Sequence, residues 1–423
     1  MRLPFLSVGG RQRRAYRAGA KRSREGPSAR LFSSVPGGTL CSVTNPLIRL
    51  LFSLVFVLLA SGCAGSGSGK EEGERTQVQQ PELEMLLEQV RSAGAPGATA
   101  IVVDTSGIRR GAIGNAVLKP LRPMRFEDRI RVASITKSFV ATIVLQLVNE
   151  RRLRLDDTVE QRLPGLLRHG TQITVGQLLN HTSGFASGDD NSPEVEALYR
   201  QHLADPEHFD VPVRKMITLA DGRPLQFDTG THYHYTNTGY DLLGLIIEEA
   251  TGGSLEAALR KRIFEPLNLR HTSFEPAPLR LDRVLAHGYA IEGSDLFAGS
   301  DVTRAGLFGT WASAGIVSNV EDLATFYGAL FGGQLLSRRQ LSEMQRTVRT
   351  RSPFVRAGLG IFRYKLECGG YAWGHGGSTH GYSSMALSSA DGTRTVAVGA
   401  NAYAFGRFYE QVEKTARDLY CDT

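Results

Sequence analysis

The stretch from Arg131 to Glu150 constrains the fold more than any other part of this sequence. Nearly every residue from Phe139 to Val148 is apolar, so a helix formed here has no clearly solvated face and is expected inside the molecule. Ser134 and Lys137 precede this run and are three residues apart, which makes them neighbours on one face of the first helical turn. We therefore predict a buried helix that carries a serine and a lysine side by side at its amino end.

A serine and a lysine in this arrangement can form an acyl-transfer site. A serine hydroxyl is a weak nucleophile at neutral pH, whereas a lysine in an apolar setting has a lowered pKa and can act as its base. The amino end of the helix adds free N–H groups where an oxyanion would develop. The Ser-x-x-Lys pattern is short, however, and also fits a helix cap followed by a solvated lysine. The choice between these interpretations depends on motifs further along the chain.

Two further motifs follow the serine in a defined order. Tyr235-Thr236-Asn237 lies in the middle of the chain, and His375-Gly376-Gly377 lies near its end. In order, spacing and flanking residues, the three motifs resemble those of the penicillin-recognising serine hydrolases. The resemblance is closest to the branch that holds class C beta-lactamases, D-alanyl-D-alanine carboxypeptidases and family VIII esterases. It covers residues 82–420 and includes the flanking stretches 179–184 and 237–244.

The resemblance implies catalytic roles for three side chains. Ser134 would attack a carbonyl carbon to form an acyl-enzyme, which water then hydrolyses. Lys137 and Tyr235 would share the proton, and the sequence leaves open which of them is the base. Asn237 would orient the substrate amide and the lysine. No cofactor and no metal ion are expected, and the chain has no His-Glu-x-x-His motif.

The third motif is expected to bind the substrate. By analogy, the N–H groups of Ser134 and Ser378 would form the oxyanion hole, and Gly376 and Gly377 would let the substrate backbone lie against a strand. His375 stands where beta-lactamases of this group usually have a lysine, whose fixed charge meets the substrate carboxylate. Because histidine is only partly charged at neutral pH, its hold on a carboxylate is expected to be weaker and pH-dependent.

These residues predict a serine hydrolase that cleaves amide or ester bonds of a small molecule or a cell-wall peptide. The favoured activity is that of a D-alanyl-D-alanine carboxypeptidase. A class C-like beta-lactamase and a small-ester hydrolase are alternatives with the same apparatus. A non-catalytic penicillin- or peptidoglycan-binding module is the alternative from another class, although such a module has no need of an intact set of catalytic residues. The oligomeric state is left open.

The pattern of apolar residues indicates one α/β domain over residues 81–423. Strands are expected near both ends of this region, in six segments: 97–104, 110–117, 358–364, 371–373, 383–387 and 393–398. Helices are expected between the two groups of strands and at both ends of the domain. We therefore predict a central antiparallel sheet flanked by helices, beside a mostly helical subdomain. The charged stretch 186–215 is expected to be a loop-rich insertion near the site.

Residues 1–62 resemble a bacterial lipoprotein signal peptide with a long basic leader. The apolar run from Leu50 to Ala60 has the length of a signal-peptide core and is too short to span a bilayer. Cleavage before Cys63 would leave this cysteine as the lipid-bearing amino terminus, followed by a flexible tether over residues 63–80. The expected location is extracytoplasmic, on the periplasmic side of a bacterial membrane. A plain secretory signal and an uncleaved anchor are the alternatives.

The distribution of charge argues against a nucleic-acid partner. The chain has a net charge of +7, but residues 1–62 hold ten basic residues and only Glu25 as an acidic one. The remaining 39 basic and 41 acidic residues make the body of the protein nearly neutral, without a basic stripe. Of the four cysteines, Cys41 would be lost with the leader and Cys63 modified. Cys368 and Cys421 remain as a possible disulfide pair.

Overall fold

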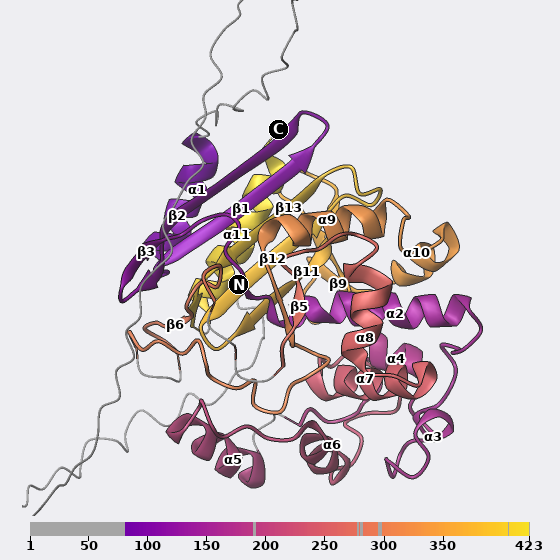
Figure 1. The fold of residues 1–423 in the computed structure, drawn as a ribbon. Coiled ribbons are helices and arrows are strands. Elements are labelled where there is room, and N and C mark those ends of the chain that lie inside the picture. The colour runs from indigo at the N-terminus through magenta and orange to yellow at the C-terminus, as the bar shows by residue number, and fades with distance from the viewer. Residues whose placement is uncertain are drawn as a thin grey trace, which may run out of the picture. The chain divides into compact units, whose positions relative to one another are not determined.

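The computed structural model describes residues 81–188, 192–276, 279, 282–294, 298–404 and 406–422. The predicted leader, Cys63 and the tether lie outside these residues. Figure 1 shows a twisted sheet with helices around it. The sheet has nine strands in the order β3-β2-β1-β13-β12-β11-β10-β9-β8, and every neighbouring pair is antiparallel. The central antiparallel sheet that the sequence predicted is therefore confirmed, and β1 pairs with β13 to join the two ends of the domain.

The strands of the large sheet are β1 (Gly97–Asp104), β2 (Gly107–Leu118), β3 (Leu121–Pro123), β8 (Val348–Arg349), β9 (Val355–Ala357), β10 (Phe362–Lys365), β11 (Tyr371–Thr379), β12 (Tyr382–Ser388) and β13 (Thr395–Ala400). Two smaller sheets consist of β4 (Ile130–Arg131), β5 (Ser273–Phe274) and β7 (Ile316–Ser318), and of β6 (Tyr289–Ala290) and β14 (Ala402–Tyr403). The helices are α1 (Pro81–Ser92), η1 (Ala133–Ile135), α2 (Thr136–Asn149), α3 (Val159–Arg162), α4 (Val175–Leu179), α5 (Pro193–Ala204), α6 (Val213–Asp221), α7 (Asn237–Thr251), α8 (Leu255–Leu259), η2 (Arg260–Phe264), α9 (Val320–Phe331), α10 (Arg338–Met344) and α11 (Arg407–Cys421).

The centre of the sheet is covered on both faces. Successive side chains of a strand point to opposite faces, and in β1 the side chains of Ala98, Ala100 and Val102 belong to the core formed with α1 and α11. Ile101 points the other way, into the core shared with α2, α7 and α9. This two-sided burial explains why β1 reads as a continuous apolar run in the sequence.

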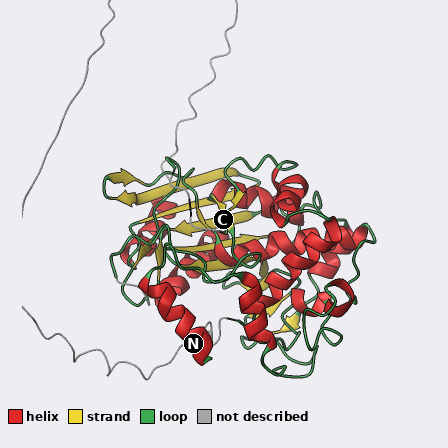
Figure 2. Ribbon diagram, turned by 60° about the horizontal axis from the view of Figure 1, so that its bottom comes forward, coloured by secondary structure: helices red, strands yellow, loops and turns green. Residues whose placement is uncertain are grey.

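A cluster of helices lies beside the sheet and forms the predicted helical subdomain. Figure 2 shows the strands of the sheet and these helices as separate regions of the described chain. The central helix α7 contacts α2, α4, α6 and α8. In α2, the residues from Thr136 to Leu145 are all buried, so the predicted buried helix is confirmed. This helix runs between the sheet and the rest of the helical subdomain and connects the two.

The stretch 186–215 differs from the sequence expectation. It contains α5 and the start of α6 rather than a continuous loop. Ser192 caps α5 by accepting a hydrogen bond from the Val195 N–H, and Pro193 occupies the first turn. The loop-rich prediction was therefore wrong for residues 193–204, because the charged residues there lie on the exposed face of an amphipathic helix, whereas residues 205–212 do form a connecting segment without a helix or strand.

Strand β11 is longer than the three residues that the sequence predicted. It continues through His375, Gly376 and Gly377 to Thr379 and pairs with β12 along this length. The ladder to β12 holds the small residues after Trp373 in an extended conformation, in agreement with the strand on which the third motif was expected. The third motif therefore lies on a central strand. The pairing of β11 with β10 ends at Phe362–Gly374, so β10 does not pair with the motif residues that follow Gly374.

Cys368 and Cys421 form a disulfide bond, with their Cα atoms 5.7 Å apart. The bond joins the turn between β10 and β11 to the last residue of α11. Within the described ranges, every helix is either too short or too polar to cross a bilayer.

Candidate active site

The nucleophile candidate Ser134 lies in η1, a single helical turn that leads directly into α2. The preceding residue, Ala133, has a φ of 47°, a left-handed conformation that is uncommon for a residue with a side chain. The turn packs against β11 and β12, where Ser384 donates a hydrogen bond of 3.1 Å to the Val132 carbonyl. A Cβ atom on Gly377 would lie 2.0 Å from that same carbonyl oxygen. Gly377 therefore allows the turn that carries Ser134 to approach the strand.

Lys137 connects the serine with the second motif. Its Nζ atom lies 3.1 Å from Ser134 Oγ and donates hydrogen bonds to Asn237 Oδ1, at 2.8 Å, and to the Ser313 carbonyl, at 2.9 Å. The lysine side chain is fully buried. The structure thus brings Ser134, Lys137 and Asn237 together as the sequence predicted, and the amine is within hydrogen-bond reach of the hydroxyl that it would activate.

The carbonyl of Ser313 is held in place by Asp241, a residue that the sequence did not mark as functional. Asp241 is in α7, and its Oδ1 atom accepts hydrogen bonds of 3.0 Å from the backbone N–H groups of Trp311 and Ser313. Burial raises the pKa of this carboxyl group to about 7, although these hydrogen bonds and nearby Lys137 oppose the shift. Asp241 therefore positions the backbone segment that contacts the lysine.

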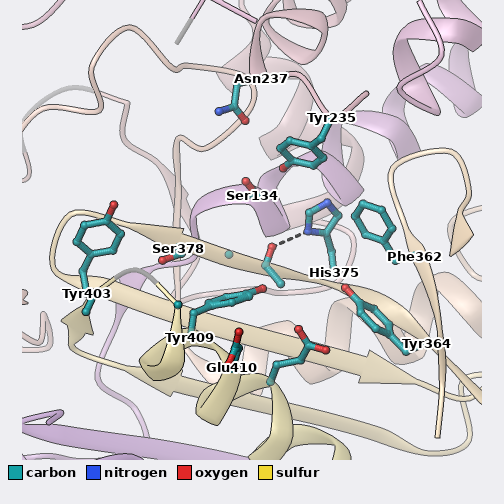
Figure 3. A pocket seen from close by; sticks show the side chains of 15 residues that line it. Ser134, Tyr235, Asn237, Phe362, Tyr364, His375, Ser378, Tyr403, Tyr409 and Glu410 are labelled. Atoms are coloured by element: carbon teal, nitrogen blue, oxygen red, sulfur yellow. Dashed lines mark hydrogen bonds between the residues drawn. The ribbon is translucent and has the colours of Figure 1, made fainter. Parts of the chain in front are cut away.

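Tyr235 is supported by His181. The two rings lie 4.4 Å apart between centroids, and the His181 backbone carbonyl accepts a hydrogen bond of 2.9 Å from the His234 N–H. The Nδ1 atom of His181 also accepts a hydrogen bond of 3.3 Å from the Thr236 N–H. In Figure 3 the hydroxyl end of Tyr235 points toward Ser134, and the Lys137 amine lies 4.9 Å from the centre of the tyrosine ring.

His375 does not have the partial charge that the sequence analysis expected. Its side chain is buried, and its Nδ1 atom lies 2.6 Å from the Gly376 carbonyl oxygen, to which it donates a hydrogen bond. Burial, and next the charge of Lys137, lower the pKa of His375 to about 3. The ring is therefore neutral at neutral pH. Its Nε2 atom is left as an acceptor that has no hydrogen-bond partner among the described residues.

A cavity of about 150 Å³ joins the three motifs (Figure 3). It is lined by these residues: Ser134, Tyr235, Asn237, Phe362, Tyr364, His375, Gly376, Gly377, Ser378, Tyr403, Ala404, Gly406, Tyr409, Glu410 and Glu413. All the predicted substrate-binding residues are in this set. The oxyanion role of the Ser134 and Ser378 N–H groups stays a prediction. In the part of the chain that is described, no three His, Cys, Asp or Glu side chains are grouped as they would be around a metal ion.

The two glycines of the third motif make room for protein atoms, which differs from the expected reason for them. A Cβ atom on Gly376 would lie 1.8 Å from the Tyr409 hydroxyl, as one on Gly377 would meet the Val132 carbonyl. The substrate backbone therefore does not fill these spaces. Both glycines line the cavity, but their small size serves the packing of α11 and of the serine turn against β11.

Helix α11 contributes Tyr409, Glu410 and Glu413 to the cavity, which the sequence analysis missed. The sequence predicted a helix at this end of the domain but assigned no site residue to it. The signal that could have found the site is Glu413, the one charged residue among the buried residues of α11. A carboxylate on an otherwise apolar helix face requires a partner or a function.

Comparison with known proteins agrees with this geometry. The family model described as Beta-lactamase matches residues 72–410. The solved structure of a D-stereospecific amidohydrolase from Streptomyces sp. is similar, with a TM-score of 0.71 and 34% identity, over 79% of this chain and 97% of that chain. Penicillin-binding protein 4* of Bacillus subtilis is 25% identical over 325 residues, which are 73% of this chain and 68% of the relative.

N-acetylmuramyl-L-alanine amidase of Bacillus subtilis is 29% identical over 211 residues, which are 46% of each protein. The chain spans about half the length of the first curated relatives that it matches. The family model, in contrast, covers most of this chain and contains the three motifs that meet at the cavity. The chain therefore belongs to the Beta-lactamase family, with the fold and the serine-hydrolase apparatus that the order of its motifs predicted.

Proposed function

We propose that this protein is a serine amidohydrolase that cleaves the amide bond of a D-configured amino-acid derivative. The D-stereospecific amidohydrolase from Streptomyces sp. supports this proposal, because it is similar along nearly its whole length. The relatives that are named as amidases or penicillin-binding proteins point to the same type of bond.

The side chains of the cavity suit an acyl-transfer reaction. Ser134 Oγ attacks the amide carbonyl, while its proton passes to the group formed by Lys137 and Tyr235. The same group protonates the leaving amine, and a water molecule then releases the acid from Ser134. Asn237 holds Lys137 through the 2.8 Å hydrogen bond and faces the cavity, where it can also orient the substrate amide.

The observation that favours an amidohydrolase over a carboxypeptidase is the charge of the cavity. A carboxypeptidase binds a substrate that ends in a free carboxylate, which a nearby cation stabilises. None of the described lining residues is a lysine or an arginine, and His375 is neutral because its pKa is lowered to about 3. The nearby Lys137 amine is already engaged by Ser134, Asn237 and Ser313. The two glutamates of α11 add negative charge, which repels a carboxylate.

The D-alanyl-D-alanine carboxypeptidase of the sequence prediction is the second candidate. The similarity to Penicillin-binding protein 4* favours it. The beta-lactamase alternative, like the carboxypeptidase, requires the cavity to bind a carboxylate, since beta-lactam substrates also carry one. A small-ester hydrolase would use the same serine without this requirement.

The test compares four substrates with the purified protein, residues 81–423: D-phenylalanine amide, L-phenylalanine amide, an acylated D-alanyl-D-alanine peptide and p-nitrophenyl butyrate. Release of ammonia from the D-amide, lost in Ser134→Ala, is the expected result. Release of D-alanine with no ammonia would establish the carboxypeptidase instead. Turnover of the ester alone would establish the esterase. If no compound is turned over, the non-catalytic binding module is the interpretation that remains.

We also propose that Cys63 carries a lipid that attaches the protein to a bacterial membrane on its periplasmic side. The Cys368–Cys421 disulfide supports an oxidising compartment. The full chain, expressed with a radiolabelled fatty acid, is expected to take up label and to remain with membranes. Label that persists in Cys63→Ala would rule out this attachment site.

A further inference from the structure

We propose that Glu413 is a binding site for a cationic group of the substrate, such as the free ammonium group of an amino-acid amide. This inference rests on the proposed amidohydrolase function and adds that the cavity selects substrates with a positively charged group. It concerns helix α11, which is distant in sequence from all three motifs.

Glu413 occupies an unusual place for a carboxylate. The other buried residues of α11 are Phe408, Val412, Thr415, Ala416 and Leu419, which pack toward the sheet. Glu413 is 4% exposed and lines the same cavity as Ser134. Burying a carboxylate costs several kcal/mol unless a partner compensates for the lost hydration. A neutral glutamine or an apolar residue would serve the packing at a lower cost.

The hydrogen bonds of Glu413 are incomplete. Its buried Oε1 atom accepts no hydrogen bond from any described residue. The nearest cation is Arg417, one helical turn further on, whose Nη2 atom lies 3.4 Å from Oε1. This guanidinium is partly exposed and is not among the residues that line the cavity. Burial therefore raises the pKa of Glu413, the charge of Glu410 adds to the increase, and Arg417 offsets only part of it. A donor that enters the cavity can supply the missing hydrogen bond.

The walls of the cavity also suit a cation. Five aromatic side chains line it: Tyr235, Phe362, Tyr364, Tyr403 and Tyr409. Figure 3 shows the hydroxyl ends of Tyr364 and Tyr409 directed toward the middle of the group of residues that line the cavity. Aromatic faces attract cations within about 6 Å, and the attraction is stronger where water is excluded. A carboxylate with aromatic walls is therefore a suitable site for an ammonium group.

His375 points to the same substrate chemistry. Its free Nε2 atom is an acceptor, so it can bind an N–H or O–H group of the substrate and cannot bind a carboxylate. Both residues line the cavity, and neither His375 Nε2 nor Glu413 Oε1 accepts a hydrogen bond from any described residue. An ammonium group has three donors. An apolar side chain in this place would leave the His375 acceptor without a partner and the Glu413 carboxylate with Arg417 alone, and a carboxylate would be repelled.

The experiment compares D-phenylalanine amide with 3-phenylpropanamide, which has the same ring and amide but no amino group. The wild-type protein is expected to hydrolyse the amino-acid amide with a kcat/KM at least about tenfold higher, which corresponds to about 1.4 kcal/mol. Glu413→Gln is expected to lower the ratio of the two kcat/KM values from at least about tenfold to near one. Glu256→Gln, which removes an exposed carboxylate from α8, is the matched control and is expected to keep the preference.

Two outcomes would overturn the inference. Equal kcat/KM values for the two amides in the wild type would show that the amino group is not recognised, and this measurement requires no variant to fold. Full preference in a folded Glu413→Gln variant would show that another residue recognises it. If the wild type hydrolyses neither amide, the proposed function has failed, and calorimetry with D-phenylalanine amide tests the subsite alone. Tighter binding to wild type than to Glu413→Gln would support the subsite, and equal binding would overturn it.

Discussion

The hydroxyl oxygen of Tyr409 lies 1.8 Å from the point that a Cβ atom would occupy on Gly376. The two residues come from different elements, since Gly376 is in β11 and Tyr409 is in α11. Here a glycine leaves the space open, and a tyrosine from the last helix brings its own hydroxyl into it.

This relationship predicts a paired mutational effect. Gly376→Ala is expected to lower the free energy of unfolding by about 1–3 kcal/mol, because the new methyl group overlaps the Tyr409 hydroxyl. Adding Tyr409→Phe is expected to recover part of this loss, since the nearest ring atom, Cζ, would be 3.1 Å from the methyl group. Urea unfolding measures both values. Gly253→Ala, where nothing lies within 4 Å of the added atom, is the control. Additive effects of the two substitutions would refute the pairing.

Lys137 is expected to be essential for turnover. Lys137→Met keeps the length of the side chain but removes the amine that contacts Ser134, Asn237 and Ser313. Loss of a positioned proton-transfer group lowers kcat by about 10²- to 10⁴-fold. The measurement is steady-state hydrolysis of the best substrate, with thermal unfolding to verify the fold. Lys365→Met removes an exposed lysine from β10 and is expected to keep full activity. Wild-type kcat in Lys137→Met would exclude the lysine from the reaction.

Asp241 is expected to act through the backbone that it holds. Asp241→Ala leaves two buried N–H groups without an acceptor, and each costs about 1–3 kcal/mol of stability. It should also lower kcat, because the Ser313 carbonyl no longer has a fixed position beside Lys137. Asp241→Asn retains the Oδ1 acceptor and is expected to be close to wild type in kcat. Equal losses in the two variants would mean that the charge matters more than the positioning.

The pH dependence of stability gives a second test of Asp241. Its pKa is raised from 3.8 to about 7 in the folded protein, so the folded state binds more protons than the unfolded state between these values. The contribution of Asp241 to stability therefore falls as pH rises from about 4 to about 7. Asp241→Asn is expected to remove this part of the decrease in urea-unfolding experiments at a series of pH values. An unchanged slope would contradict the raised pKa.

The site residues that the sequence predicted are either close neighbours along the chain or members of a recognised motif. Ser134 and Lys137 are three residues apart, so helical geometry alone made them neighbours. Tyr235 and His375 followed from the resemblance in order and spacing. Asp241 stood within a recognised stretch, but its contact with the Trp311–Ser313 segment depends on tertiary packing. Neither residue pattern nor spacing contains that information.

The missed features share a physical cause. The sequence predicted a helix at the end of the domain, but the rotation of α11 about its own axis, which turns Glu413 toward the cavity, is set by packing. The sequence placed Gly376 and Gly377 in a strand region, but the predicted strand ended at Trp373, because small residues have little intrinsic preference for strands. The ladder to β12 supplies the order that local propensity does not. In both cases contacts between distant segments decided the outcome.

His375 is expected to make the protein less stable in acid. Its pKa is lowered from 6.5 to about 3, so the unfolded state binds more protons between these values. The corresponding stability is fully present above about pH 6.5 and is lost as the pH falls toward 3. His380, with a pKa of about 3 through burial and the neighbouring His202, adds to the same slope. His375→Gln is expected to reduce the slope of unfolding free energy between pH 6.5 and 5, whereas exposed His208→Gln is not. Equal slopes for wild type and His375→Gln would mean that the ring is not buried as described.

The Cys368–Cys421 disulfide is expected to contribute to stability and little to turnover. The two cysteines are 53 residues apart, and a loop of this size corresponds to about 4 kcal/mol in the chain-entropy account. Cys368→Ser with Cys421→Ser is therefore expected to lower the free energy of unfolding by an amount of this order, measured without reductant.

Activity well below the unfolding temperature is expected to persist in this double variant. The end of α11 that faces the cavity, with Tyr409 and Glu413, is also held by the buried side chains of Phe408, Val412 and Ala416. Reduction of the wild type should reproduce the loss of stability, and reductant should have no effect on the variant. A folded double variant that loses the preference for amines would show instead that the disulfide fixes the orientation of α11 at the site.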